Sequence, residues 1–293
     1  MRQIYDKCIY VNVKLKKCIE YIQAQNFEEA IISSAHIWIV ISDMIKRMEE
    51  LDPKQEIPMF EEKLVIHIIN EIMKAKNNNN YIQVKDLIES QLQPIFISLQ
   101  RELGLKAPIT EPVFYNQNME NCMDYNPELA NYIKEIPISI AEEFKFEEAL
   151  SGNVILKREL KNQRTIHFHS IQDPWLEAQK FIDQCDNQNK ERFLVFGLGW
   201  GFHIFELLDR YKEVIIFEAD AALIRLWFEH RDIKGSIWGR GAQLIYDPDF
   251  KKLQMALGKL NREKDTFVIH YPSYINLQSE MIKFENMIKT ERK

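Results

Sequence analysis

The feature that most constrains the fold of this chain is a glycine-rich segment placed directly after a run of apolar residues. Residues 192–203 read Arg-Phe-Leu-Val-Phe-Gly-Leu-Gly-Trp-Gly-Phe-His, and a second apolar run, residues 214–217, ends at Glu218. A short continuous apolar run is typical of a parallel strand buried on both faces. The pattern therefore predicts a strand, a glycine loop, a helix and a second strand that ends in a carboxylate, which is the first half of a nucleotide-binding α/β domain.

The rest of the C-terminal half continues this alternation. Asp173 and Pro174 are typical of an N-cap and the first helical position, and that helix is predicted to run to about Cys185. Strands that alternate with helices across short loops predict a parallel sheet flanked by helices. The predicted strands are residues 192–197, 214–218, 242–246 and 266–270, and the predicted helices lie near residues 201–211, 220–230, 249–262 and 276–289.

The N-terminal half has the pattern of helices. Residues 1 to about 106 contain almost no glycine, and apolar residues recur there at helical spacing, with predicted helices at about residues 60–75 and 84–103. Two prolines and a loss of periodicity predict a linker at residues 106–116, after which residues 116–150 return to helical character.

The period of the apolar pattern changes near residue 150. Gly152 and Asn153 predict a turn, and residues 154–160 and 165–169 predict a β-hairpin with a polar loop between them. The predicted architecture is thus an all-α domain, residues 1–150, followed by a Rossmann-like α/β domain with a leading β-hairpin, residues 151–293.

Composition narrows the class of protein. The net charge of −6 argues against a nucleic-acid binder, because such proteins are usually basic. The four cysteines show neither a CxxC pair nor zinc-ligand spacing, which is typical of reduced thiols in a cytoplasmic protein. No apolar stretch reaches the roughly 20 residues of a membrane span, and the N-terminus lacks the apolar core of a signal peptide. A cytoplasmic location is expected, with neither nucleic acid nor a membrane as a partner.

The glycine loop and two carboxylates form the candidate cofactor site. Gly197, Gly199 and Gly201 would let the backbone approach a ligand, and the following helix would direct free N–H groups at an anion. Glu218 ends the next strand, where such folds bind ribose hydroxyls, and Asp247 follows the third strand, where an adenine amine could be held. In the alternative interpretation, the glycines only permit a tight turn and close packing, and Glu218 is a solvated strand end.

Four further residues are candidates for ligand contact: His169, Ser170, His203 and His270. His203 falls in the first turn of the glycine-loop helix, and His270 at the carboxyl end of a strand, where α/β folds place ligand contacts. His167 alternates with His169, so both face the same side of the hairpin. Since no Cys, Asp or Glu supplies the obvious remaining ligands, no metal site is expected.

The glycine loop with its carboxylate resembles an S-adenosylmethionine methyltransferase. Such enzymes usually carry an acid two residues before the first glycine, and this chain has Val195 there. The segment from His270 to Tyr274 reads His-Tyr-Pro-Ser-Tyr, which is similar to the Asp/Asn-Pro-Pro-Tyr signature of amino-methyltransferases. His270 and Ser273 replace its first and third residues.

A second resemblance covers residues 154–290. The chain reads His-Ser-x-x-Asp-Pro-x-x-Glu-Ala from His169, Gly-x-Gly-x-Gly-Phe-His from Gly197, and Phe-Glu-x-Asp from Phe217, followed by the segment from His270. In this order the motifs resemble the N-terminal part of the motility-associated-factor family, flagellin glycosyltransferases that transfer nonulosonic acids to Ser or Thr. In that family a catalytic sialyltransferase-like domain normally follows, so the resemblance implies that the catalytic machinery is largely absent from this chain.

The sequence leaves three functional interpretations open. The first is an accessory, nucleotide-binding-like module of a flagellin glycosyltransferase, with flagellin or another acceptor protein and a separate glycosyltransferase domain as partners. The second is a methyltransferase that uses S-adenosylmethionine. The third is a scaffold whose glycine loop is filled by its own side chains, Trp200 first among them. The ligand would be a nucleotide, a nucleotide sugar or S-adenosylmethionine, and no catalytic residue is assigned.

Overall fold

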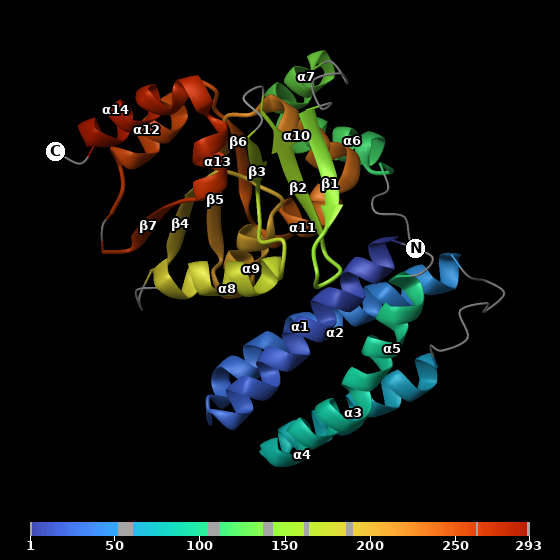
Figure 1. Cartoon of the computed structure of the whole chain (residues 1–293). Coiled ribbons are helices and arrows are strands. Elements are labelled where there is room, and N and C mark those ends of the chain that lie inside the picture. Colours follow the sequence, from blue (N-terminus) through green and yellow to red (C-terminus); the bar gives the residue numbers. More distant parts are fainter. Residues whose placement is uncertain are drawn as a thin grey trace. The chain divides into compact units, whose positions relative to one another are not determined.

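The computed structural model describes residues 2–51, 61–104, 112–136, 143–160, 164–185, 190–261 and 263–291. The chain divides into two compact units, residues 1–109 and residues 110–293. Figure 1 shows that the first unit is built from helices, whereas the second combines helices with strands.

The first unit is helical, as predicted. Its elements are α1 (Arg2–Gln23), α2 (Phe27–Leu51), α3 (Glu62–Asn77), α4 (Tyr81–Leu87), the π-helix η1 (Ile88–Leu92) and α5 (Gln93–Gly104). Helix α1 packs against α2 and α5, and α3 packs against α4. The helix predicted at residues 84–103 lies within one continuous helical stretch, residues 81–104, which contains the π-helix η1 in its middle. The predicted linker lies largely outside the described residues.

A four-stranded parallel sheet forms the centre of the second unit. Its strands are β4 (Arg192–Phe196), β5 (Glu213–Glu218), β6 (Gln243–Tyr246) and β7 (Asp265–Ile269). They lie in the order β6-β5-β4-β7, and every neighbouring pair is parallel. The four strands and their parallel arrangement confirm the sequence prediction.

Helices alternate with these strands along the chain. They are α8 (Pro174–Cys185), α9 (Phe202–Arg210), α10 (Ala221–His230), α11 (Ile233–Ser236), α12 (Lys251–Leu257), α13 (Tyr271–Asn276) and α14 (Met281–Glu291), with 3₁₀ turns at Trp238–Arg240 and Gln278–Glu280. Leu194 and Phe196 of β4 pack with Leu253 of α12 and Phe284 of α14, which builds the core on one face of the sheet. Asp173 caps α8 as predicted, because its Oδ1 accepts from the amide of Trp175 at 3.1 Å.

A second, antiparallel sheet differs from the prediction by one strand. Its strands are β1 (Phe144–Glu148), β2 (Val154–Glu159) and β3 (Thr165–His167), in the order β1-β2-β3. The hairpin of β2 and β3 was predicted, but residues 144–148 were predicted to be helical. The segment Phe-Lys-Phe-Glu-Glu alternates apolar and polar residues only at its start, which is too short a pattern to predict a strand. Its strand structure results from pairing with β2.

The boundary between the units also differs from the predicted one near residue 150. Helices α6 (Tyr115–Tyr125) and α7 (Pro127–Glu135) pack against α10, so they belong to the α/β unit. Asn118 of α6 is fully buried; its Nδ2 donates to the carbonyl of Phe228 at 2.9 Å, and its Oδ1 accepts from the amide of Ile233 at 3.1 Å. Helical periodicity cannot show which neighbour a helix packs against, and here the neighbour lies more than a hundred residues further along the chain.

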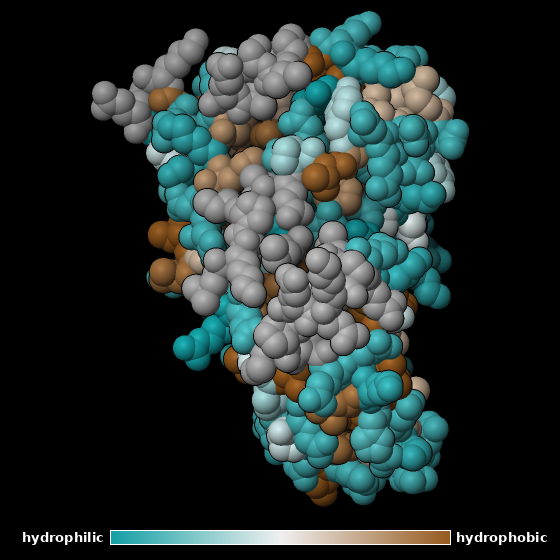
Figure 2. Space-filling view, turned by 90° about the vertical axis from the view of Figure 1, so that its right-hand side faces the viewer, coloured by the Kyte–Doolittle hydropathy of each residue, from teal (hydrophilic) through white to brown (hydrophobic). Residues whose placement is uncertain are grey.

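None of the described helices is long and apolar enough to cross a membrane. The face shown in Figure 2 is mainly hydrophilic, with small apolar patches between polar residues. Exposed apolar side chains such as Ile82, Leu150 and Ile282 come from separate elements, as is usual for folded proteins.

Candidate functional site

The glycine loop joins β4 to α9, and its backbone depends on its glycines. Gly197, Gly199 and Gly201 have φ angles of +102°, +50° and +92°, which other residues rarely adopt. The amide of Gly197 donates to the carbonyl of Phe217 at 2.8 Å, so the loop begins as an extension of the sheet. Helix α9 begins at Phe202. The predicted succession of strand, loop and helix is confirmed.

The space beside the glycine loop is filled by side chains of the same unit. Every residue from 193 to 204 is buried. A Cβ on Gly197 would overlap the Cβ of Ser273 and lie 2.5 Å from its Oγ. A Cβ on Gly199 would lie 2.7 Å from Cε1 of His270. Not even a methyl group fits on the Cβ side of these two glycines, so side chains of the same unit pack directly against the loop.

Two tryptophans complete the packing around the loop. A Cβ on Gly201 would lie 2.5 Å from two ring atoms of Trp227, whose Nε1 donates to the carbonyl of Gly199 at 2.9 Å. The side chain of Trp200 is 2% exposed, and the centroid of its ring lies 5.2 Å from the ring centroid of Phe146 in β1. The interpretation in which Trp200 is the first side chain to fill the loop stays a prediction. The ring of Trp227 lies against Gly201, and the buried ring of Trp200 packs against Phe146 of the antiparallel sheet.

Glu218 ends β5 with its carboxylate turned to the glycine loop. It is 3% exposed; Oε2 accepts from the amide of Leu198 at 2.7 Å, and Oε1 accepts from the amides of Ala219 and Asp220, both at 2.8 Å. Burial raises the pKa of the Glu218 carboxyl to about 7; the charge of Asp220 adds to this effect, and the three amides oppose it. The alternative of a solvated strand end is wrong, because the carboxylate is buried and accepts three backbone amides of its own chain. The contact with a ribose stays a prediction.

Asp247 follows β6, as predicted, and its side chain stabilises the fold through a backbone contact. It is 4% exposed, and its Oδ2 accepts from the amide of Leu253 in α12 at 2.8 Å. A cavity of about 590 Å³ lies beside it, lined also by Tyr132 of α7 and Tyr246. The rings of these two tyrosines are stacked with centroids 4.2 Å apart. None of the residues that line this cavity belongs to the glycine loop.

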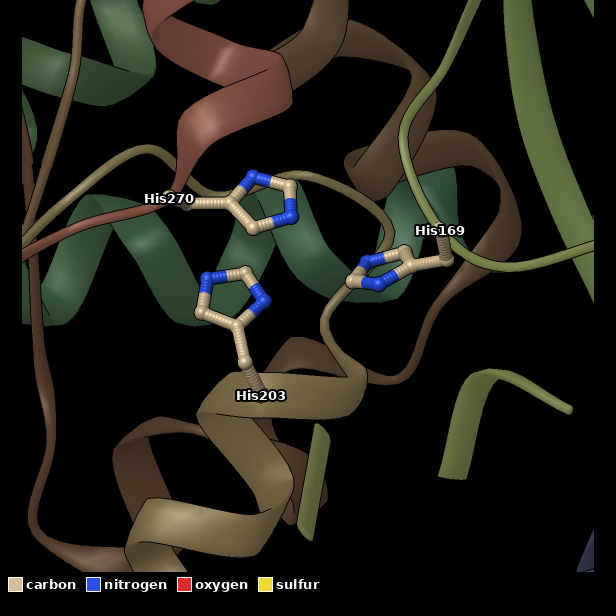
Figure 3. Close-up of side chains that lie close together, drawn as sticks. All are labelled: His169, His203 and His270. Carbon is tan, nitrogen blue, oxygen red and sulfur yellow. The ribbon is translucent and has the colours of Figure 1, made fainter. Parts of the chain in front are cut away.

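Three histidines meet beside the glycine loop (Figure 3). His169 follows β3, His203 lies in the first turn of α9, and His270 follows β7. They are 3%, 1% and 6% exposed, and one ring nitrogen of each lies within 4.8 Å of the other two. The rings of His203 and His270 are stacked, with centroids 4.1 Å apart. We call these residues the histidine cluster. The sequence predicted each as a ligand contact, but predicted neither their meeting nor a metal site.

The three imidazoles are held in the neutral form. Burial is the main cause that lowers the pKa of each, to about 3 for His203. For His203 and His270, neighbouring imidazoles lower the pKa further. Each ring also has a hydrogen-bonding partner outside the cluster: Glu177 for His169, the carbonyl of Gly197 for His203, and Ser273 for His270.

Ser170 and His167 do not join the histidine cluster. The Oγ of Ser170 accepts from the amides of Gln172 at 3.2 Å and Asp173 at 3.3 Å, so it shapes the turn before α8. The imidazole of His167 is 37% exposed, and its Nε2 lies 3.6 Å from a carboxylate oxygen of Glu147. The structure shows a role for Ser170 in the turn, and its contact with a ligand stays a prediction.

Several residues of the site were not predicted. Glu177 contacts His169 from the first turn of α8, and its place in the motif that begins at His169 is the signal that could have pointed to it. Arg158, Asp220 and Asn276 form a part-buried network, in which Nη1 of Arg158 donates to Asp220 at 3.0 Å and to Asn276 at 2.7 Å. Nothing local in the sequence indicates this network, because its members lie on β2, before α10 and on α13.

Comparisons with models of protein families, with curated proteins and with solved structures found no match for this chain. The fold and the site define its class as an α/β protein with a parallel sheet, a preceding helical unit and a buried glycine loop.

Proposed function

We propose that the α/β unit is a Rossmann-like accessory module that works without a cofactor in its glycine loop. The observation that carries this proposal is the filled loop. Ser273, His270 and Trp227 occupy the space next to the glycines, and the carboxylate of Glu218 accepts three backbone amides. A cofactor would have to displace these side chains and leave buried amides without an acceptor, which is energetically costly.

The strand order supports the Rossmann-like part of the proposal. Numbered along the chain from β4, the sheet order is 3-2-1-4, which matches the first four strands of the doubly wound sheet that binds dinucleotides. The glycine loop follows the first strand, and a carboxylate ends the second, as in that fold. These features support a Rossmann-like fold, and the side chains packed against the glycines support a loop without a cofactor.

The motifs that resemble the flagellin glycosyltransferases support an accessory role in protein glycosylation. Residues of separate motifs build the closed loop together: His169 accepts from the amide of Trp200, His203 bonds the carbonyl of Gly197, and Glu218 holds the amide of Leu198. The separate motifs therefore supply residues that hold one and the same loop. In this proposal the module contacts flagellin or another acceptor protein, or a separate catalytic domain that transfers the sugar.

A methyltransferase is the rival proposal, because Glu218 stands at the end of β5 and faces the glycine loop. In that case S-adenosylmethionine would have to open the loop and replace the amides at this carboxylate. The two proposals differ in whether the isolated chain binds an adenosyl ligand.

Deletion of the gene in its source organism tests the accessory role. We expect flagellin from the deletion strain to lose the mass of its attached sugars, with wild-type flagellin mass restored when the gene is returned. Intact-protein mass spectrometry of purified flagellin gives the result. Flagellin that keeps its full sugar mass in the deletion strain would contradict the proposal, and loss of a methyl mass from flagellin would favour the rival.

A further inference from the structure

We propose that the histidine cluster binds one Zn²⁺ ion through one ring nitrogen of each of His169, His203 and His270. The three side chains come from separate elements and are directed toward one another (Figure 3). All are buried, and one nitrogen of each lies within 4.8 Å of the other two. Neutral imidazole is a preferred ligand of Zn²⁺, and three protein ligands are enough to hold this ion.

The outer nitrogens of the three rings already have the partners that metal-binding histidines usually have. Such a ring donates its second N–H to a carboxylate, a backbone carbonyl or another oxygen acceptor, which fixes the ring and its tautomer. The contacts are Nδ1 of His169 to Oε2 of Glu177 at 3.3 Å, Nε2 of His203 to the carbonyl of Gly197 at 2.9 Å, and Nδ1 of His270 to Oγ of Ser273 at 2.8 Å. A carboxylate, a carbonyl and a hydroxyl thus stand behind the three rings.

The inner nitrogen of His203 is the strongest single indication. A carbonyl oxygen only accepts, so Nε2 of His203 carries the proton and Nδ1 carries a lone pair. This Nδ1 is buried and has no hydrogen-bond partner, on a side chain that is 1% exposed. A buried acceptor without a partner calls for an explanation, and an ion at this point would provide one.

The inner nitrogen of His169 is also a lone pair. The amide of Trp200 donates to Nε2 of His169 at 3.1 Å, which places the ring proton on Nδ1, facing Glu177. Zn²⁺ would take the place of this amide, at the energetic cost of leaving a buried N–H without its acceptor, and the bond to zinc must exceed that cost. Nδ1 of His270 lies 2.8 Å from Oγ of Ser273, and the ring also has a backbone hydrogen bond to Phe168. Nε2 of His270 supplies the third lone pair in the tautomer in which Nδ1 donates to Ser273, so Zn²⁺ binding would fix that tautomer and replace the bond to Phe168.

The rings must move closer when the ion binds. Zn–N bonds of about 2.0–2.1 Å place the ligand nitrogens of a tetrahedral site roughly 3.4 Å apart. The nitrogens of the cluster are separated by up to 4.8 Å, and His203 and His270 are inclined by only 5° to each other. Zn²⁺ binding therefore requires the ring nitrogens to move closer by about an ångström and one of the two stacked rings to rotate. Within the described residues the cluster offers three nitrogens, so a water molecule would be the fourth ligand.

Metal binding by the protein without a purification tag tests this proposal. After treatment with a chelator, the full chain is dialysed against Zn²⁺ or Co²⁺, and the bound metal is measured by elemental analysis. We expect one ion per chain, and with Co²⁺ the visible absorption of a tetrahedral site without a thiolate charge-transfer band. The absence of that band separates the cluster from the four cysteines.

Two variants and a matched control locate the ion. His203→Phe keeps an aromatic ring and removes both nitrogens, so it is expected to abolish binding. Glu177→Ala changes an accessible carboxylate behind His169 and is expected to weaken Zn²⁺ binding about tenfold or more. His167→Ala removes a part-exposed histidine of the same hairpin and is expected to leave binding unchanged.

Each possible result either supports or contradicts the zinc site. One tetrahedral Co²⁺ ion per chain whose affinity falls in Glu177→Ala supports the site, even if His203→Phe does not fold. No bound metal in the folded wild-type chain overturns the proposal. So does metal that remains bound in folded His203→Phe, or that is lost in His167→Ala. None of these results depends on the role in glycosylation.

Discussion

Gly197→Ala is expected to lower the free energy of unfolding by about 4 kcal/mol, from the strain of a positive φ together with overpacking. The φ angle of Gly197 is +102°, and a Cβ there would overlap Ser273. The comparison is made by urea unfolding, followed by circular dichroism and tryptophan fluorescence. A loss of this size is a large part of the stability of an ordinary domain, typically about 5–15 kcal/mol.

Gly241→Ala is the matched control. Its φ angle of +83° carries similar strain, but the nearest atom that a Cβ would meet is the carbonyl oxygen of Lys212, at 3.4 Å. We expect a loss of only about 1–2 kcal/mol from strain alone. In a Ser273→Gly background, Gly197→Ala should regain about 1–2 kcal/mol, because the overlapping side chain is gone. Equal losses at Gly197 and Gly241 would mean that the loop is not filled.

Glu218→Ala is expected to lower the free energy of unfolding by about 3 kcal/mol or more, because buried amides lose their acceptor. The carboxylate accepts from Leu198, Ala219 and Asp220. Glu218→Gln should lose about 2 kcal/mol, since one oxygen can still accept two amides while its amide nitrogen faces the N–H of Leu198. The same urea unfolding measures both variants.

Glu213→Gln provides the control on the same strand. Glu213 begins β5, its side chain is 53% exposed, and its contact with Arg192 is 3.6 Å long. Exposed ion pairs of this kind contribute about 0–1 kcal/mol, so we expect a change of less than about 0.5 kcal/mol. If Glu218→Ala is as mild as Glu213→Gln, Glu218 does not hold the loop and is free for another role.

The strands of the parallel sheet could be predicted because they are buried on both faces. Continuous apolar runs such as residues 193–196 carry that information locally, and glycines after such a run indicate a turn that needs positive φ. What fills the loop could not be predicted in the same way. Ser273 and Trp227 come from elements far along the chain, and only the folded sheet brings them to Gly197 and Gly201.

The histidine cluster illustrates the same limit of local patterns. Spacing along the chain pairs His169 with His167, two residues away, and no Cys, Asp or Glu completes an obvious ligand set with them, so the sequence predicts no metal site. The structure instead brings His169 to His203 and His270, from two other elements. Both latter residues were predicted at positions where α/β folds bind ligands, because strand ends and helix starts share one edge of the sheet.

The strand β1 and the unit boundary were missed for a related reason. The five residues of β1 are too few to show a period, and pairing with β2 outweighs their helical context. Helices α6 and α7 look like those of the first unit in sequence, but the buried side chain of Asn118 ties α6 to the backbone that follows α10.

Calorimetric titration of the folded wild-type chain tests most directly whether the glycine loop is closed. S-adenosylhomocysteine, adenosine nucleotides and cytidine nucleotides are titrated in turn, with circular dichroism to show that the chain is folded. We expect no heat of binding from any of them, because the loop is filled by Ser273, His270 and Trp227. Micromolar binding that is lost in a folded Glu218→Gln variant would contradict a closed loop and would make the chain a cofactor-binding protein.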